Sequence, residues 1–323
     1  MPLPAGTIEA LLQRRVVFVV GKGGTGRTTV AAAIALLAGR AGKRVLAVDV
    51  EATGHLAAAL GQRFAEFRPR VLQPNVSGIE LRAEESFQEY LGLYFKVPRL
   101  ARLTPLSRVF DFIATGVPGP RDMLVVGKIA YEERRRDQGR PAWDLIVVDS
   151  AASGHSVSHL GAAKAMLTLV RGGVIRNQVQ WIDDLVRDPQ RSTCVVTALP
   201  EEMPVVEAVE LRQRLRSEVG VDVGAAVLNR VMLLNTTPAQ RSLVTALLDE
   251  QHAEAVRSRL GGNPQPFDDA LELCRRLHER SEQHERQLRH AFREPVLQVP
   301  LMTTKPGLAT TRAVAAALSG RAA

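Results

Sequence analysis

A stretch near the N-terminus carries the residue types that bind phosphate groups. It reads Gly-Lys-Gly-Gly-Thr-Gly-Arg-Thr and runs from Gly21 to Thr28. Glycines let consecutive backbone N–H groups converge on one point, and the N-terminus of a following helix adds positive potential. The composition predicts a site for nucleotide phosphates, with contacts from Gly21, Gly23, Gly24, Thr25, Gly26, Arg27, Thr28 and Thr29.

The residues on either side of this stretch predict the elements that a phosphate-binding loop requires. Val16–Val20 is a short β-branched run, typical of a buried strand. Thr28–Ala38 is rich in Ala, Leu and Ile and contains no Gly or Pro, which predicts a helix. A strand, a glycine loop and a helix in this order match the P-loop, in which the hydroxyl at the position of Thr28 contacts magnesium. We therefore expect ATP or ADP to bind here with Mg²⁺.

The two basic residues of the loop predict different things. Arg27 stands where the P-loop pattern has a lysine. Arginine keeps the positive charge, so we expect phosphate binding. Its planar guanidinium is bulkier than an ammonium group, which puts rapid hydrolysis in question. Lys22-Gly23-Gly24 is the deviant Walker A signature, whose early lysine reaches the nucleotide of a facing subunit. Lys22 is thus a catalytic candidate and predicts a face-to-face dimer.

A second set of candidates follows another predicted strand. Asp144–Asp149 reads DLIVVD, and Asp149 at its end is placed to hold magnesium directly or through water. Gly154 would allow the backbone to approach a γ-phosphate closely. His155 and His159 lie four residues apart on an expected helix. A metal site there is a minor alternative, because no carboxylate motif accompanies the pair.

Short apolar runs alternate with helical stretches along the chain. This alternation predicts an α/β fold with a mainly parallel sheet flanked by helices, in which ligands bind at the carboxyl ends of strands. The glycine loop, Asp49–Glu51 and Asp149 all fall at such ends. The expected strands are Val16–Val20, Arg44–Asp49, Gly78–Leu81, Asp144–Asp149, Thr193–Ala198, Val223–Leu228 and Val296–Val299.

Two regions depart from the alternation. Apolar side chains recur at helical spacing within residues 82–140 and again within residues 237–292. We expect one P-loop ATPase domain over residues 1–323, with a helical insertion at about 82–140 and a second helical segment at about 237–292. Two interpretations of these helices stay open: amphipathic helices packed on the sheet, or a surface that binds a partner.

The composition is that of an ordinary globular protein, with 46% apolar and 24% charged residues among 323. The net charge is +8, but the arginines are interleaved with Asp and Glu, and aromatic residues are only 4%. We therefore expect no specific nucleic-acid partner. The two cysteines, Cys194 and Cys274, form no Cys-x-x-Cys pair, so we expect no zinc.

The sequence shows no signal peptide and no apolar run long enough to cross a bilayer. We expect a cytoplasmic protein. Its positive charge would permit a peripheral attraction to anionic membranes. The apolar C-terminal helix expected at Leu308–Leu318 is interpreted as packing on the sheet, with a membrane anchor as the alternative.

Taken together, the motifs resemble those of one family of P-loop NTPases of the SIMIBI type. Residues 149–155, Asp-Ser-Ala-Ala-Ser-Gly-His, resemble switch II of the ArsA-type anion-transporting and tail-anchored-protein targeting ATPases. Residues 45–56 resemble the family's switch I, and residues 193–207 resemble the strand and turn after switch II. The resemblance implies that Asn229 contacts adenine and that the backbone at Pro300 and Leu301 lines the adenine site.

The resemblance also assigns roles in switch I. The family's catalytic aspartate, which positions the attacking water, aligns with Glu51. The extra methylene of glutamate displaces the carboxylate, and a shift of about an ångström can lower a rate on the order of a hundredfold. Glu51 is the preferred catalytic residue and a candidate for contacting magnesium through water. Asp49 is the competing candidate, or else a strand-end residue that supports the loop.

The family implies further properties of the whole protein. These are ATP hydrolysis, a homodimer or a heterodimer with a paralogous subunit, and a hydrophobic or membrane-protein client. The zinc-sharing Cys-x-x-Cys of the eukaryotic targeting factor and the metalloid cysteines of the arsenite pump are not present in this sequence. Two alternatives stay open: a positioning ATPase resembling the ParA and MinD group, and a weakly active nucleotide-binding regulatory subunit paired with a paralogue.

Overall fold

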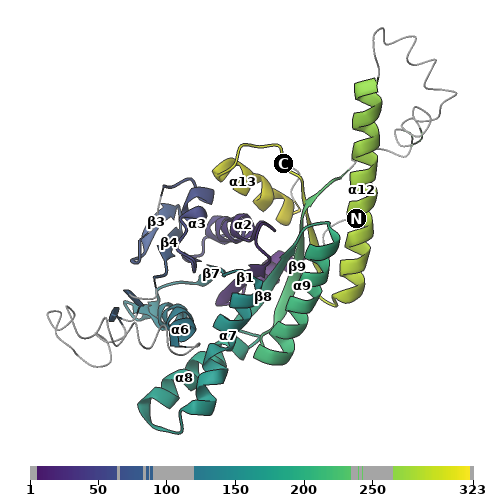
Figure 1. Cartoon of the computed structure of the whole chain (residues 1–323). Coiled ribbons are helices and arrows are strands. Elements are labelled where there is room, and N and C mark those ends of the chain that lie inside the picture. Colours follow the sequence, from purple (N-terminus) through teal and green to yellow (C-terminus); the bar gives the residue numbers. More distant parts are fainter. Residues whose placement is uncertain are drawn as a thin grey trace.

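The computed structural model describes residues 6–63, 66–82, 85–86, 88–89, 120–233, 239, 242 and 265–320. Within them an eight-stranded sheet forms the centre of the molecule, in the order β10-β9-β8-β1-β7-β2-β4-β3 (Figure 1). Neighbouring strands are parallel, except for the antiparallel edge pair of β3 and β4. The strands are β1 Val16–Gly21, β2 Val45–Asp49, β3 Arg70–Gln73, β4 Val76–Glu80, β7 Leu145–Asp149, β8 Ser192–Ala198, β9 Val223–Val231 and β10 Val296–Pro300.

Helices cover both faces of the sheet. One face packs against α1 Thr7–Leu12, α2 Arg27–Arg40, α3 His55–Ala59 and α13 Leu308–Leu318. The other packs against α6 Pro120–Arg134, α7 Ser153–Leu169, α8 Gly173–Arg187, α9 Glu202–Arg214 with its π-helical extension Leu215–Val219, and α12 Gln265–Ala291. This double covering buries the central strands β1, β2, β7 and β8 at every position: Phe18 of β1 faces one core while Val17 and Val19 face the other.

The predicted fold class is confirmed, and each of the expected strands is present with its ends shifted by a few residues. The edge strand β3 was not predicted, because Arg70 and Val71 are exposed and the segment has no apolar run. The prediction also placed Arg136–Pro141 inside a helical insertion. That segment is instead a two-stranded hairpin of β5 Arg136–Asp137 and β6 Arg140–Pro141, whose turn uses positive φ at Gln138 and Gly139.

The two regions expected to be helical are described in part. Residues 90–119 of the first and most of residues 234–264 of the second lie outside the described residues. In the second region α12 extends beyond the end of the sheet (Figure 1). Its C-terminal half packs on the body of the protein, with Ser281, His284 and Leu288 buried.

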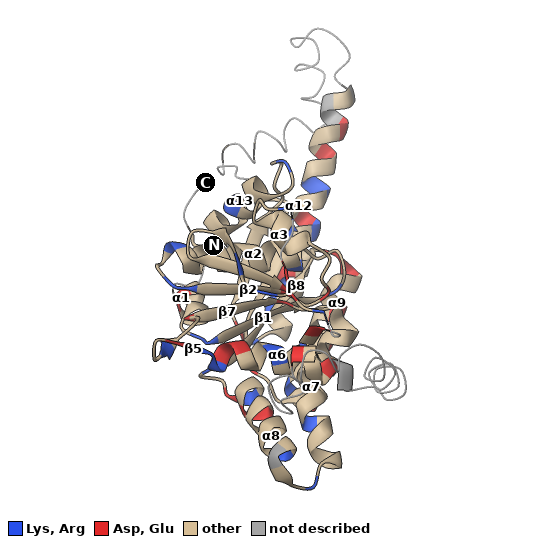
Figure 2. Cartoon of the chain, turned by 90° about the vertical axis from the view of Figure 1, so that its left-hand side faces the viewer, with Lys and Arg blue, Asp and Glu red and all other residues tan. Residues whose placement is uncertain are grey.

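Acidic and basic residues are interspersed along the helices (Figure 2). The C-terminal helix α13 packs against α2, with Thr311, Val314 and Leu318 buried, as the packing interpretation predicts. Among the described residues we find no helix that combines the length and the apolar character needed to span a membrane.

Candidate functional site

The glycine loop connects β1 to α2 at the carboxyl edge of the sheet. Strand β1 ends at Gly21, and α2 begins at Arg27 after Gly26, whose φ is +90°. Two of the glycines are required by their neighbours. A Cβ on Gly26 would lie 2.1 Å from Nδ2 of Asn229, and one on Gly21 would lie 2.3 Å from Oγ1 of Thr197. The loop is therefore packed so closely that only backbone can occupy these positions.

Polar side chains from beneath hold this loop in place. The Thr25 hydroxyl donates to the carbonyl of Lys22 at 2.8 Å and lies 2.8 Å from the Thr197 hydroxyl. Asn229 donates to the carbonyl of Thr25 at 2.9 Å and accepts the N–H of Arg230 at 2.9 Å. The side chains of Thr25 and Asn229 thus brace the loop, a use that the sequence does not reveal for either one.

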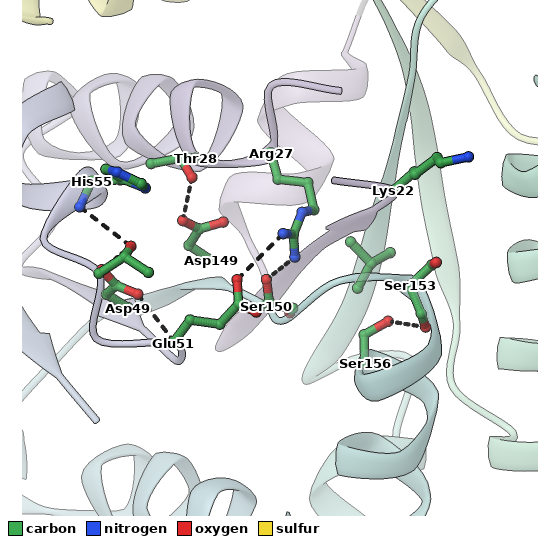
Figure 3. Close-up of polar contacts among 12 residues, drawn as sticks. Lys22, Arg27, Thr28, Asp49, Glu51, His55, Asp149, Ser150, Ser153 and Ser156 are labelled. Carbon is green, nitrogen blue, oxygen red and sulfur yellow. Dashed lines mark hydrogen bonds and ion pairs between the residues drawn. The ribbon is translucent and has the colours of Figure 1, made fainter. Parts of the chain in front are cut away.

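Thr28 and Asp149 meet at the start of α2. The Thr28 hydroxyl donates to Oδ2 of Asp149 at 2.6 Å (Figure 3). The other carboxylate oxygen, Oδ1, is buried and has no hydrogen-bond partner among the described residues. A hydroxyl beside an unsatisfied carboxylate oxygen is the ligand chemistry that Mg²⁺ uses in P-loop proteins. The residues therefore fit this cation.

The environment of Asp149 disfavours its charge. Burial raises the pKa of its carboxyl to about 7, against the hydrogen bond from Thr28 and the charge of Arg27, with Asp49 and Glu51 adding repulsion. A bound cation would favour the charged form.

Arg27 points toward the two switch segments. Its guanidinium donates to the carbonyl of Ser150 and lies 3.5 Å, Nη2 to Oε2, from Glu51 (Figure 3). The side chain is 11% exposed, whereas that of Glu51 is 45% exposed. The two residues at which the loop and switch I differ from the family pattern are in direct contact.

Asp49 organises the turn that carries Glu51. Its carboxylate accepts the N–H of Glu51 at 3.1 Å, the N–H of Gly54 at 3.2 Å and the Thr53 hydroxyl at 3.3 Å. Ala52 in this turn has a φ of +50°, which an alanine rarely adopts. Asp49 is buried and satisfied within the turn, while Glu51 faces the open side of the site.

Lys22 lies apart from the other basic residue of the loop. Figure 3 shows its side chain pointing away from Arg27. The ammonium group pairs with Oε1 of Glu207 on α9 at 2.6 Å, and the side chain is 44% exposed. Lys22 has its hydrogen bond with Glu207, whereas Thr28 and Asp149 are hydrogen-bonded to each other. Glu207 was not among the predicted site residues, and it lies 185 residues from Lys22 in the chain.

A cavity of about 240 Å³ opens beside the loop. Its lining joins the loop residues Gly26 and Thr29 to the predicted base-side residues Asn229, Pro300 and Leu301. The structure adds residues that the sequence reading did not select, from the segment after β10 and from α13: Met302, Thr304, Pro306, Gly307, Thr310, Thr311 and Val314. The cavity therefore joins the glycine loop to the residues that the resemblance places at the adenine.

Gly154 lies in the first turn of α7, and no atom lies within 4 Å of the position that a Cβ there would take. Farther along the helix, His159 contacts Oδ1 of Asp122 on α6 at 3.2 Å, and Ser158 donates to the same carboxylate. Burial works to raise the pKa of Asp122, but hydrogen bonds from His159 and Ser158 hold it below its ordinary value. In the part of the chain that the structure describes, no group of three His, Cys, Asp or Glu side chains could hold a metal ion.

Comparisons with known proteins agree with this geometry. The model of the anion-transporting ATPase family matches residues 14–174, which include the loop and both switches. ATPase BagA of Mycobacterium tuberculosis is 31% identical over 252 residues, covering 76% of this chain and 73% of that protein. ATPase get3 of Schizosaccharomyces japonicus is 23% identical over 292 residues, covering 79% of this chain and 87% of that protein.

A putative arsenical pump-driving ATPase of Halobacterium salinarum is 24% identical over 237 residues, covering 68% of this chain and 36% of that protein. The relatives share the name ATPase, and the residues that the family model matches include the glycine loop, Thr28, Asp149 and both switch segments. This chain belongs to the anion-transporting ATPase family.

Proposed function

We propose that the protein binds ATP with magnesium and hydrolyses it as a dimer, and that its nucleotide state controls binding of a hydrophobic client or a membrane-associated partner. One observation carries the nucleotide part of the proposal. The Thr28 hydroxyl and the unsatisfied oxygen of Asp149 lie at the N-terminus of α2, beside a glycine loop in which Gly21 and Gly26 leave no room for a side chain. Family membership supports the same activity.

The chemistry expected from this chain follows from where the side chains point. Backbone N–H groups of the loop would bind the phosphates, and Thr28 and Asp149 would hold the metal. Magnesium, when bound, would neutralise phosphate charge during transfer to water. Glu51, whose carboxylate is exposed, is the proposed group that orients the attacking water, whereas Asp49 holds the switch I turn.

ATP binding and turnover can be tested on the purified chain. We expect ATP to bind, magnesium to strengthen the binding, and Thr28→Ala and Asp149→Asn to abolish the magnesium effect. Glu218→Gln would serve as the control, because this carboxylate pairs with Arg214 on the surface and is not part of the site. Calorimetric titration and phosphate release would measure both steps. A wild-type chain that binds no ATP would rule the function out.

The dimer part of the proposal rests on Lys22 and its surroundings. Lys22 is on the outside of the loop, and α9 beside it exposes Met203 and Val206, which are 59% and 46% accessible. An exposed lysine flanked by apolar side chains suits contact with a facing subunit. Light scattering should show a dimer with ATP and a loss of that dimer in Lys22→Ala. A homodimer would appear with the pure chain, whereas a chain that dimerises only with a paralogue would stay monomeric.

The client part rests on an apolar cavity of about 190 Å³ between α6, α7 and α8. Leu169 and Ile175, at the turn between α7 and α8, are 72% and 48% exposed beside it. The region belongs to the proposed helical insertion and to the helices that pack on it. Photo-crosslinkers at Leu169 and Ile175 should capture apolar peptides in an ATP-dependent way, and a crosslinker at the exposed Arg216 should not. Equal crosslinking with and without ATP would show that the nucleotide does not control peptide binding.

The contact between Arg27 and Glu51 also favours a second candidate function. A chain whose catalytic carboxylate is held by the loop arginine would turn ATP over slowly and serve as a nucleotide-gated regulatory subunit. Turnover of the wild type beside Arg27→Lys separates the two candidates. A large gain in the lysine variant supports the regulatory role, and no gain supports the active enzyme.

A further inference from the structure

The two positions at which this chain differs from the family pattern form a single contact. Arg27 replaces the P-loop lysine, and Glu51 replaces the catalytic aspartate of switch I. The guanidinium lies between the switches: Nη1 donates to the carbonyl of Ser150, and Nη2 lies 3.5 Å from Oε2 of Glu51. Residues from the loop, switch I and switch II are thus joined through one side chain.

Both residue types are needed for this contact. An aspartate at position 51 would be one methylene shorter, about 1.5 Å, and would leave the carboxylate beyond ion-pair distance of Arg27. A lysine at position 27 has one nitrogen on a flexible stem and cannot offer two nitrogens in a fixed geometry. Arginine with glutamate makes the bridge, whereas lysine with aspartate does not.

The bridge and a phosphate compete for the same nitrogens. A guanidinium binds a phosphate best through two parallel N–H donors. In the structure, both Nη atoms of Arg27 are directed at Ser150 and Glu51. Because Glu51 and a terminal phosphate are both anions that attract the same guanidinium, the ion pair with Glu51 competes with a phosphate for the position of the Arg27 side chain.

We propose that Arg27 is a phosphate-responsive bridge, which ties Glu51 of switch I to Ser150 of switch II and exchanges Glu51 for the terminal phosphate of a nucleotide. The exchange frees Glu51 to orient water and releases the two switches from each other in the same step. This inference rests on the proposed nucleotide binding and adds to it a competition within the chain. The Asp49 hydrogen bonds keep the turn in place while the Glu51 side chain changes partner.

A double-mutant cycle tests the competition. ATP affinity is measured without magnesium for the wild type, Glu51→Gln, Arg27→Lys and the double variant. Glu51→Gln removes the competing carboxylate, so we expect about threefold to tenfold tighter binding. The same change made together with Arg27→Lys should alter affinity less than twofold relative to Arg27→Lys alone, because a lysine does not form the bridge. Hydrogen exchange at residues 49–56 and 149–156 should rise in Glu51→Gln without nucleotide.

The controls separate this inference from the function on which it rests. Glu218→Gln removes a carboxylate that pairs with Arg214 on the surface, and it should leave affinity unchanged. Melting temperatures confirm folding; Glu51 is exposed, so its replacement should leave them unaltered. Equal effects of Glu51→Gln with and without Arg27→Lys would indicate general charge repulsion and overturn the bridge. A wild-type chain that binds no ATP would instead remove the proposed function itself.

Discussion

At the scale of the residue, Asp149 is the group whose surroundings most clearly call for a ligand. Its carboxylate is buried, has one satisfied oxygen and one unsatisfied oxygen, and lies near two further carboxylates. Burial of an uncompensated charge is unfavourable, so the pKa rises to about 7. A divalent cation would supply the missing compensation, which is why we place magnesium here and not at the histidines of α7.

This environment predicts a pH dependence of stability in the metal-free protein. Because the folded pKa of about 7 lies above the ordinary value of 3.8, the wild type loses stability as pH rises from about 4 to 7. Asp149 would account for a loss of at most about 1.4 kcal/mol of unfolding free energy per pH unit. In urea unfolding with a chelator present, the unfolding free energy of Asp149→Asn should therefore rise relative to that of the wild type as the pH increases across this window. A constant difference between the two proteins would contradict the raised pKa.

At the scale of the element, the loop between β1 and α2 depends on how closely β8 and β9 approach it. Thr197 of β8 and Asn229 of β9 fill the space under the loop: Thr197 donates to the carbonyl of Val20 in β1, and Asn229 donates to the carbonyl of Thr25 in the loop. Gly26 packs directly on Asn229, whereas Gly23 faces open space. The glycines of one motif therefore have unequal structural importance.

This difference predicts unequal effects of two alanine substitutions. Gly26→Ala introduces a Cβ 2.1 Å from the Asn229 amide at a φ of +90°, so we expect a loss of about 2–4 kcal/mol of unfolding free energy. Gly23→Ala meets neither obstacle, and its effect should stay within about 0.5 kcal/mol. Denaturant titration of both variants measures this. Similar losses would show that the close packing is not what requires glycine.

Helix α9 is the other element that contacts the loop, through the ion pair of Glu207 with Lys22. If Lys22 serves a facing subunit, it must leave Glu207 when the dimer forms. Glu207→Gln weakens the internal pair, so we expect ATP-dependent dimerisation to become about twofold to fivefold tighter. Sedimentation at several concentrations would measure it. Glu201→Gln, an exposed carboxylate just before α9, is the matched control and should have no effect.

At the scale of the whole molecule, switch II is connected to the helical region through α7. This helix starts directly after Asp149–Ala152, and its His159 and Ser158 bind Asp122 in the first turn of α6. The α6 helix lines the apolar cavity. A movement of switch II would therefore be carried by α7 to α6.

This connection predicts that a substitution at Asp122 weakens the response of α6 to ATP and leaves ATP binding itself intact. Asp122→Ala removes the acceptor of both hydrogen bonds and should lower stability by about 1–3 kcal/mol. Hydrogen exchange in α6 should respond to ATP in the wild type and respond little in the variant, while ATP affinity stays within about twofold. Asp184→Ala, on α8, is the control. An unchanged response in Asp122→Ala would show that another contact carries the coupling.

The sequence by itself determined the fold class and the location of the nucleotide site. Apolar runs that are buried on both faces leave little choice but a parallel sheet between helices, and a glycine loop must follow β1 for its N–H groups to converge. Both depend on local residue types and their order in the chain. The motifs also pointed to Arg27, Thr28 and Asp149, and the family resemblance added Glu51. In the structure Thr28 contacts Asp149, and Arg27 contacts Glu51.

Only the tertiary structure decided what each polar group of the site contacts. Lys22 with Glu207, Asn229 with Thr25 and Asp122 with His159 are pairs whose members come from distant segments, and no local pattern encodes them. The division between Asp49 and Glu51 was likewise open in the sequence. The structure shows that Asp49 accepts the backbone hydrogen bonds of the turn while Glu51 is exposed, which supports the proposal that Glu51 orients water, because a buried carboxylate satisfied within the turn is not free to do so.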